Sequence, residues 1–169
     1  MIFKDKFIKR SFDLCFSFFG LIFCIPIIAI SWVISAIETK SNGFFIQNRV
    51  GFNGKLIKVI KIKTMKNTNQ ARSSITTESV NSITKSGAFF RKYKIDELPQ
   101  LWNVLVGDMS FVGPRPDVPG YADLLEGDDR LVLSIRPGIT GPASLKYKNE
   151  EELLSEQPNV YCLLFITEN

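Results

Sequence analysis

The sequence of 169 residues contains no histidine and only three cysteines. Without histidine, imidazole cannot act as a general base or metal ligand, so acid–base chemistry must come from Asp, Glu, Lys, Tyr or Cys. Cys15, Cys24 and Cys162 have neither zinc-site nor redox spacing, and the first two lie in an apolar segment where small hydrophobes are expected. The chain also lacks a P-loop, a Rossmann glycine fingerprint and internal repeats, so the nucleotide-binding and repeat folds that these patterns mark are not expected.

The charges of the chain are unevenly distributed. The net charge is only +4, but five lysines crowd one short interval, at Lys55, Lys58, Lys61, Lys63 and Lys66. A basic band of this kind suits an anionic membrane surface or a phosphorylated ligand. No base-reading motif accompanies it, so we expect no nucleic-acid partner. With 45% hydrophobic residues, the length supports one modest domain.

Much of the apolar content lies in residues 12–37, which are interrupted by Asp13 and by Pro26. About 20 apolar residues are enough to cross a bilayer, so a plain spanning helix is one interpretation. Pro26 predicts a kink, and basic residues on both flanks favour keeping both ends on the cytoplasmic side. A re-entrant helix that bends at Pro26 is therefore the second interpretation, and the residues alone leave both open.

The middle of the chain predicts a small amount of β-structure. Residues 44–50 and 55–63 are expected to form two strands joined by a turn that contains Asn53 and Gly54. Residues 67–81 are rich in Thr, Ser and Asn and are expected to form an exposed loop. A short helix is predicted over residues 87–93, which include Arg91. Residues 136–142 predict a rigid turn that carries Arg136.

The most informative stretch is residues 94–116, KIDELPQLWNVLVGDMSFVGPRP. The acid pair Asp96-Glu97 precedes a short helix whose Leu98, Leu101, Trp102 and Leu105 are predicted to share one face. Gly107 is expected to end this helix, and Pro114, Pro116 and Pro119 prevent another. Either the acids cap the helix, as Asp often does, or they hold a metal and a phosphate opposite Arg115.

Several blocks of sequence, in order, resemble the bacterial monotopic phosphoglycosyl transferases, or polyprenyl-phosphate sugar transferases. These blocks are KRSFDL, QNRVGFNGK, KIKTM, TKSGAFFRKYKIDELPQLWNVLVGDMSFVGPRP and RPGITGPASLKYKNEEELL. The resemblance covers nearly the whole chain up to residue 154, and it favours the catalytic interpretation of Asp96-Glu97 over capping.

The resemblance implies an enzyme that transfers a sugar-1-phosphate from a UDP-sugar to polyprenyl (undecaprenyl) phosphate in the membrane and releases UMP. It implies that Asp96 is the nucleophile, that Glu97 is associated with Mg²⁺, and that the helix breaks at Pro26. A carboxylate can attack phosphorus and divide one displacement into two.

Cationic side chains would have to compensate the charge of the diphosphate. Arg115 and Arg136 are the main candidates, because a guanidinium can bind phosphate through two hydrogen bonds, and surface ion pairs are the alternative. Pro114 and Pro116 belong to the same predicted phosphate- or nucleotide-binding loop. Lys61 and Arg91 are weaker candidates, and Gln47 and Arg49 are weaker still. We expect Lys9, Arg10 and Asp13 to fix the helix at the membrane interface.

The sequence therefore predicts a small membrane-associated α/β protein. Residues 1–40 would form a re-entrant, Pro-kinked membrane helix, and residues 41–169 a cytoplasmic catalytic domain with a short β-hairpin and amphipathic interface helices. The expected place is the cytoplasmic face of a bacterial inner membrane, in contact with membrane lipid, and a homodimer is compatible with the sequence. Relatives usually continue beyond this C-terminus, so a truncated, inactive relative is one alternative. A transferase that moves only the sugar and releases UDP is another.

Overall fold

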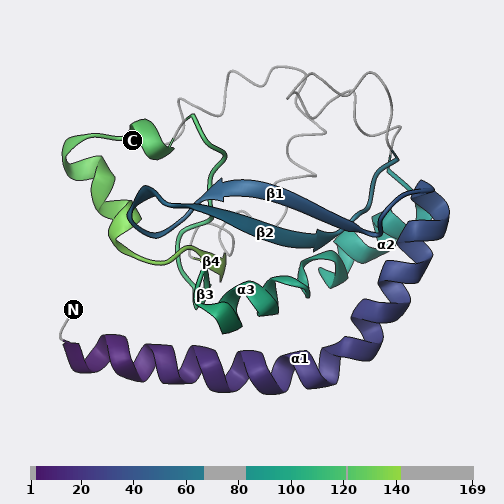
Figure 1. Ribbon diagram of the computed structural model, residues 1–169, viewed down its shortest axis with the longest axis horizontal. Coiled ribbons are helices and arrows are strands. Elements are labelled where there is room, and N and C mark those ends of the chain that lie inside the picture. Colours follow the sequence, from purple (N-terminus) through teal and green to yellow (C-terminus); the bar gives the residue numbers. More distant parts are fainter. Residues whose placement is uncertain (1–2, 67–82, 121, 142–169) are drawn as a thin grey trace.

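The computed structural model describes residues 3–66, 83–120 and 122–141, and it is a mixed structure of helices and small sheets (Figure 1). In chain order, its helices and strands are α1 (Phe3–Thr39), β1 (Phe44–Val50), β2 (Leu56–Ile62), α2 (Lys85–Lys92), α3 (Gln100–Val106), β3 (Ser110–Val112) and β4 (Gly138–Thr140). Short 3₁₀ turns lie between them, and one of these, η3 (Ile95–Glu97), contains the acid pair.

The long apolar N-terminal helix predicted by the sequence is present as α1. The helix is long and apolar enough to cross a membrane by length and composition, and Pro26 lies within it. Many of its large apolar side chains face outward, as in Phe23 (77% exposed) and Ile37 (71%). The ribbon of α1 runs below the domain and then changes direction toward α2 (Figure 1).

One face of α1 is buried in two stretches, toward its two ends, and the buried residues are small or polar rather than large and apolar. Its buried members recur at helical spacing, at Asp13, Ser17, Ser31, Ser35 and Thr39. Between them, an added Cβ at Gly20 would lie 3.5 Å from Leu101 Cδ1 of α3. Because helix backbones approach closely where side chains are small, α1 packs against the domain near both of its ends and at its centre.

The predicted hairpin is confirmed. Strands β1 and β2 pair antiparallel, with Phe44 opposite Ile62 and Val50 opposite Leu56. The connecting turn places Asn53 at φ 56° and Gly54 at φ 78°, which is the left-handed region that Asn and Gly adopt most readily.

The helix predicted near residues 87–93 is also confirmed, and it begins slightly earlier. In α2 the side chain of Thr84 caps the first turn by accepting a hydrogen bond from Gly87 N at 2.9 Å. A Cβ at Gly87 would collide with the carbonyl of Thr64, so the helix can approach the end of β2 closely only with glycine here. The predicted loop over residues 67–81 lies outside the described residues.

Gly107 ends α3 in the left-handed conformation (φ 97°), as predicted, but the residues predicted to share one face are not buried together. Leu101 and Val104 are buried, whereas Trp102 is 52% exposed. The reason is that α3 contacts both α1 and β2, so its buried surface is not the stripe that Leu98, Leu101, Trp102 and Leu105 would make.

The predicted rigid turn over residues 136–142 is partly wrong, because its centre forms strand β4. This strand pairs parallel with β3, with Ser110 opposite Gly138 and Val112 opposite Thr140. The proline-rich segment that follows β3 contains no helix as far as Pro119, as expected. Its backbone is tied to β4 by Gly138 N, which donates to Pro114 O at 2.8 Å.

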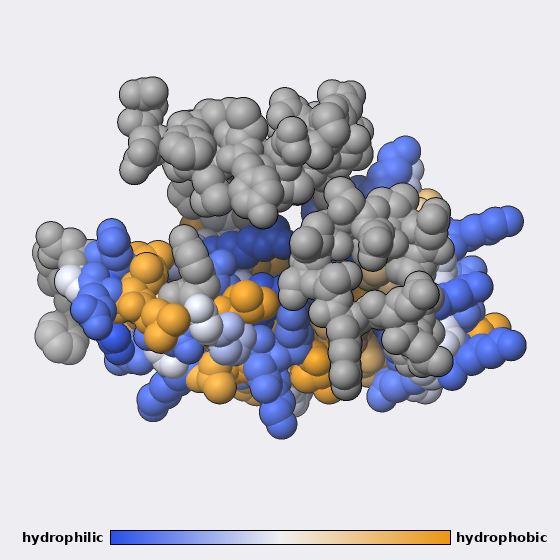
Figure 2. All heavy atoms as spheres, turned by 90° about the horizontal axis from the view of Figure 1, so that it is seen from above, coloured by the Kyte–Doolittle hydropathy of each residue, from blue (hydrophilic) through white to orange (hydrophobic). Residues whose placement is uncertain are grey.

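The main core lies between β2 and the α3–β3 segment and contains Ile57, Val59, Val104 and Met109. Seen from above (Figure 2), hydrophilic side chains project around the rim of the molecule, with hydrophobic patches between them. The outer surface of α1, by contrast with the face seen in Figure 2, is mostly apolar.

Asn103 is a polar residue inside this core and is only 2% exposed. Its amide joins α3 to the free edge of β2. Nδ2 donates to Lys58 O at 2.7 Å, and Oδ1 accepts from Ile60 N at 3.2 Å. The side chain therefore pairs two backbone groups that the hairpin alone leaves unpaired.

We predict that Asn103→Ala lowers the free energy of unfolding by about 2–3 kcal/mol, because two buried backbone groups of β2 lose their partners. Chemical denaturation of the detergent-solubilised protein measures this. Asn48→Ala, at an exposed position of the same hairpin, is the control and should change stability by less than about 0.5 kcal/mol. Equal effects of the two substitutions would contradict the bridging role of Asn103.

Candidate active site

The acid pair lies in η3, the tight turn between α2 and α3. The chain enters this turn through Lys94, whose φ of 56° reverses its direction. Asp96 is 9% exposed, and its Oδ1 atom is buried without a hydrogen-bond partner. Glu97 instead accepts a hydrogen bond and forms an ion pair with Lys61 of β2, at 2.8 Å. Two adjacent carboxyl groups therefore have opposite surroundings, one unpaired and one paired.

The capping interpretation of the acid pair is wrong in this structure. The N-cap residue of α3 is Pro99, and no side chain accepts a hydrogen bond there. The 3₁₀ turn that holds the acids also has no side-chain cap. Because capping does not use Asp96, helix formation does not explain why a carboxyl group is buried at this position.

The environment of Asp96 raises the pKa of its carboxyl group. Burial is the main cause, and the neighbouring charge of Glu97 adds to it. Lys61, Arg91 and Lys94 act in the opposite direction. A buried carboxyl whose ionised form depends on nearby cations is typical of a reactive site.

Two predicted cationic residues lie around the acid pair. Lys61 reaches it from β2, and Arg91 acts on the Asp96 carboxyl from the last turn of α2. Arg91 Nε also donates to Thr64 Oγ1 at 2.9 Å, which orients its guanidinium. Lys94 was not predicted as a site residue. Its charge also acts on Asp96, and its place two residues before Asp96 in the sequence was the available signal.

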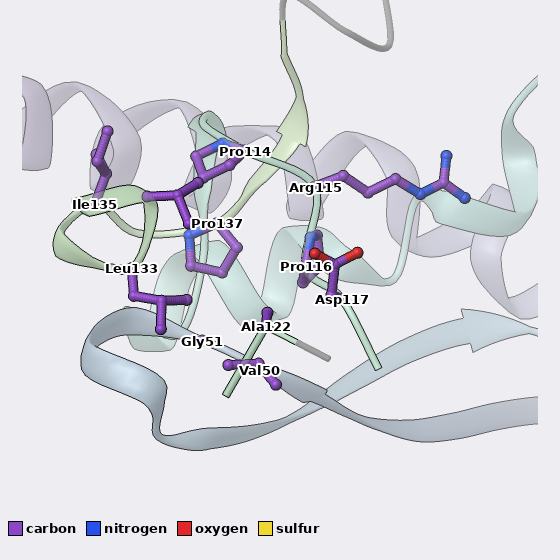
Figure 3. A pocket seen from close by; sticks show the side chains of 11 residues that line it. Val50, Gly51, Pro114, Arg115, Pro116, Asp117, Ala122, Leu133, Ile135 and Pro137 are labelled. Atoms are coloured by element: carbon purple, nitrogen blue, oxygen red, sulfur yellow. The ribbon is translucent and has the colours of Figure 1, made fainter. Parts of the chain in front are cut away.

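Arg115 lies on the proline-rich loop and, like Pro114, Pro116 and Pro137, belongs to the lining of an apolar hollow; its exposed side chain extends away from these prolines (Figure 3). The charge of Arg115 acts on Arg49, since burial and, after it, the charge of Arg115 lower the pKa of the Arg49 guanidinium. Two neighbouring guanidinium groups form a surface that an anion would stabilise.

The two prolines of this loop accept backbone hydrogen bonds that hold the loop in place. Pro116 O accepts from Arg49 Nη1 at 3.2 Å, and Pro114 O accepts from the first residue of β4. Arg49 is itself held by Gln47, whose Oε1 accepts from Arg49 Nη2 at 2.7 Å. Gln47 and Arg49 lie two residues apart on β1, so their side chains lie on the same face of the strand. This spacing is the feature of the sequence that could have predicted their contact.

Arg136 is placed at the other end of α3 from the acid pair. Its Nε donates to Gly107 O at 2.9 Å, and its guanidinium lies 5.6 Å from the centroid of the Phe52 ring. The helix between these two places has seven residues, which corresponds to about 10 Å. The structure therefore does not bring Arg136 to Asp96, and its role in phosphate binding stays a prediction.

The basic and acidic residues near the start of α1 contact the domain directly. Arg10 donates to Val104 O at 2.7 Å and to Leu105 O at 2.9 Å, and Lys9 donates to Val112 O at 2.8 Å. Asp13, 3% exposed, accepts from Ser110 Oγ at 2.9 Å. Their predicted role at the membrane interface stays a prediction, and within the structure they bind α1 to α3 and β3.

The residues present fit a magnesium ion that is completed by substrate. Within the described ranges, no group of three or more His, Cys, Asp or Glu could hold a metal alone. Mg²⁺, however, often binds through one or two carboxylates together with phosphate oxygens. Glu97 supplies an accessible carboxylate, and the unpaired Oδ1 of Asp96 lies beside it.

An unpaired buried carboxyl, an adjacent carboxylate and several cations are features expected of an enzyme site for an anionic, phosphate-containing substrate. Comparison with known proteins identifies its family. The model of the bacterial sugar transferase family matches residues 4–164. The chain belongs to this family and is a phosphoglycosyl transferase.

Three relatives illustrate the similarity. The chain is 38% identical to the Bacillus subtilis sugar transferase EpsL, over 84% of this chain and 70% of the relative. It is 38% identical to the UDP-glucose:undecaprenyl-phosphate glucose-1-phosphate transferase of Klebsiella pneumoniae, over 94% of this chain and 36% of the relative. The Escherichia coli protein of the same name is 35% identical, over 90% of this chain and 34% of the relative. The chain thus spans about a third of the two longer relatives.

We predict that Asp96→Asn stabilises the protein at neutral and alkaline pH. Because the pKa of Asp96 is raised, the folded protein binds this proton more tightly than the unfolded chain does. That contribution to stability is fully present below the unfolded-state pKa and is lost as pH rises through the raised pKa. The unfolding midpoint of the variant should exceed that of the wild type by about 2–4 °C at pH 8.

The same difference should shrink as the pH falls through the raised pKa of Asp96. Thermal unfolding in chelator, without nucleotide, measures it across this range. Asp129→Asn, at an exposed position, serves as the matched control and should show no such trend. A stability difference for Asp96→Asn that is the same at every pH would contradict the burial argument.

Proposed function

We propose that this protein transfers a sugar-1-phosphate from a UDP-sugar to polyprenyl (undecaprenyl) phosphate and releases UMP. The observation that carries the proposal is the unpaired, buried carboxyl of Asp96 next to Glu97 and within reach of the charges of Lys61 and Arg91. The names of the Klebsiella and Escherichia coli relatives support it, since both specify UDP-glucose and undecaprenyl phosphate.

In this proposal Asp96 is the nucleophile. Its carboxylate attacks the phosphorus that carries the sugar, and the bond from that phosphorus to the bridging oxygen of the diphosphate breaks. UMP leaves with the electron pair, and an acyl phosphate that carries the sugar remains on Asp96. An oxygen of polyprenyl phosphate then attacks the same phosphorus, which restores the carboxylate and yields a sugar diphosphate lipid.

Charge compensation decides whether Asp96 can approach an anionic diphosphate. Lys61 and Arg91 act on the Asp96 carboxyl and favour its ionised form. Glu97 would hold Mg²⁺, which supplies further positive charge to the phosphate oxygens when bound. The Arg49 and Arg115 guanidinium groups supply a second cationic surface for the nucleotide phosphates.

The contacts of α1 support a re-entrant helix whose two ends lie on the same, cytoplasmic side of a bacterial inner membrane. Near one end, Asp13 binds Ser110 of β3. Near the other end, Ser35 donates to Lys63 O, and Glu38 accepts from Ser86 Oγ at 2.5 Å. Because both halves of α1 contact the same domain, a spanning arrangement would have to break one set of these contacts.

We predict that incubation with Mg²⁺ and the correct UDP-sugar, without lipid acceptor, releases UMP and leaves a phosphosugar on Asp96. Mass spectrometry should find the added mass on the peptide that contains Asp96, and polyprenyl phosphate should remove it. Asp96→Asn should abolish both adduct and turnover, because an amide is a far poorer nucleophile.

Glu97→Gln is the matched comparison, since it neutralises the neighbouring acid but leaves the nucleophile in place. This variant should lower turnover at least about 100-fold, the order expected when a metal ligand is lost, and any adduct should still map to Asp96. An adduct on another residue, or substantial activity of Asp96→Asn, would refute the assignment of the nucleophile.

A second prediction concerns topology. In a variant whose three native cysteines are serine, single cysteines introduced at Lys4 and at Asn42 should both react only after the cytoplasmic face is exposed. Pro26→Leu should favour a straight, spanning helix, because leucine restores the missing backbone donor and relieves the ring clash. Reaction of the two positions from opposite sides in the parent variant would establish a spanning helix and exclude re-entry.

A further inference from the structure

Lys61 pairs with one of the two carboxylate oxygens of Glu97, the residue proposed to bind the metal ion. Its Nζ atom lies 2.8 Å from Glu97 Oε1, and the two side chains are 27% and 22% exposed. Within the described residues, this lysine is the only hydrogen-bond partner of the Glu97 carboxylate. The arrangement is therefore a complete ion pair at the edge of the active site.

The position of Lys61 on β2 determines the face of the strand on which its side chain lies. Lys61 lies on β2 at period-2 spacing from Ile57 and Val59, which are both buried in the main core. Its side chain thus leaves the sheet on the face that packs against α3, and it meets the acid pair there. Arg91, the other cation near the acids, is instead oriented by Thr64.

Glu97 cannot hold an ammonium group and a divalent ion on the same oxygen. A magnesium ion lies about 2.0–2.1 Å from its oxygen ligands, inside the space that the Lys61 ammonium fills at hydrogen-bond distance. The two cations would also repel each other. Asp96, 9% exposed and with Oδ1 unpaired, is the neighbouring carboxyl, and the charge of Lys61 acts on it as well.

We propose that Lys61 is a resident counterion that Mg²⁺ displaces from Glu97, after which the freed ammonium binds the diphosphate of the donor. The inference rests on the proposed function, because it takes Glu97 as the metal-binding carboxylate. Lys61 thereby couples the two events. It opposes metal binding while the nucleotide is absent and favours nucleotide binding once the metal is present.

This coupling gives Lys61 two effects of opposite sign. Removing the ammonium frees Glu97 and removes a repulsive charge, so divalent-cation affinity without nucleotide should rise about three- to tenfold. Removing it also deletes a phosphate partner, so UDP should bind more weakly to the metal-loaded protein, by about tenfold. A lysine that served only to hold the fold would produce neither pattern.

The test is a titration of the full chain in nanodiscs with Mn²⁺ as the probe, with the loss of the free-ion EPR signal as the readout. Lys61→Met should bind Mn²⁺ about three- to tenfold more tightly than the wild type. Lys58→Met is the matched control, because it removes the same charge from an exposed position on the opposite face of β2. It should change the affinity less than about twofold.

Adding Glu97→Gln to each protein completes a double-mutant cycle. Glu97→Gln should weaken Mn²⁺ binding and should remove the gain produced by Lys61→Met. Lys61→Gln repeats the test with a polar residue, and circular dichroism confirms that each variant is folded. Unchanged or weaker Mn²⁺ binding by both Lys61 variants, while Glu97→Gln still weakens binding, would overturn the counterion proposal alone. Unchanged Mn²⁺ binding after Glu97→Gln would overturn the metal assignment of the proposed function, and the counterion proposal with it.

Discussion

The C-terminal end of α3 is the contact on which the rest of this structure depends. The last carbonyl groups of a helix lack the regular partners of its interior, and here two arginines from distant parts of the chain bind carbonyls of the last turn and of the C-cap residue. Arg10 of α1 binds the carbonyls of Val104 and Leu105, and Arg136 binds that of Gly107. Positive groups at this end also complement the helix dipole. A short helix of seven residues thereby joins the apolar helix to the loop after η5 (Gly127–Ser134).

From this joint the structure extends to the acid pair at the other end of α3. Asn103 fixes α3 to β2, and β2 carries Lys61 to Glu97. The buried face of α1 holds the same unit from below, through small and polar side chains. Such a scaffold can keep Asp96 buried and unpaired, an arrangement that costs stability and is expected where a carboxyl must react rather than support the fold.

The parts that the sequence predicted correctly have local signals. Asn53-Gly54 predicts the hairpin turn, Gly107 predicts the end of α3, and the long apolar run predicts α1. The parts it missed depend on contacts between distant residues. Nothing near residue 138 indicates that it pairs with Ser110, and no local pattern places Arg136 at Gly107 or Asp13 at Ser110. Trp102 is exposed although Leu101, predicted to share its face, is buried, because periodicity does not reveal how many neighbours a short helix has. The acid pair itself was found through resemblance, since spacing alone also permitted a cap.

The central claim is that the phosphorus next to the sugar moves together with the sugar. A UDP-sugar labelled with ³²P at that phosphorus distinguishes this reaction from simple sugar transfer. UDP-glucose and UDP-N-acetylgalactosamine are the first donors to test, since names of relatives specify them. After incubation with membranes that contain the protein and undecaprenyl phosphate, the account predicts labelled lipid and unlabelled UMP. Label that stays in water-soluble UDP while the sugar enters the lipid would contradict it.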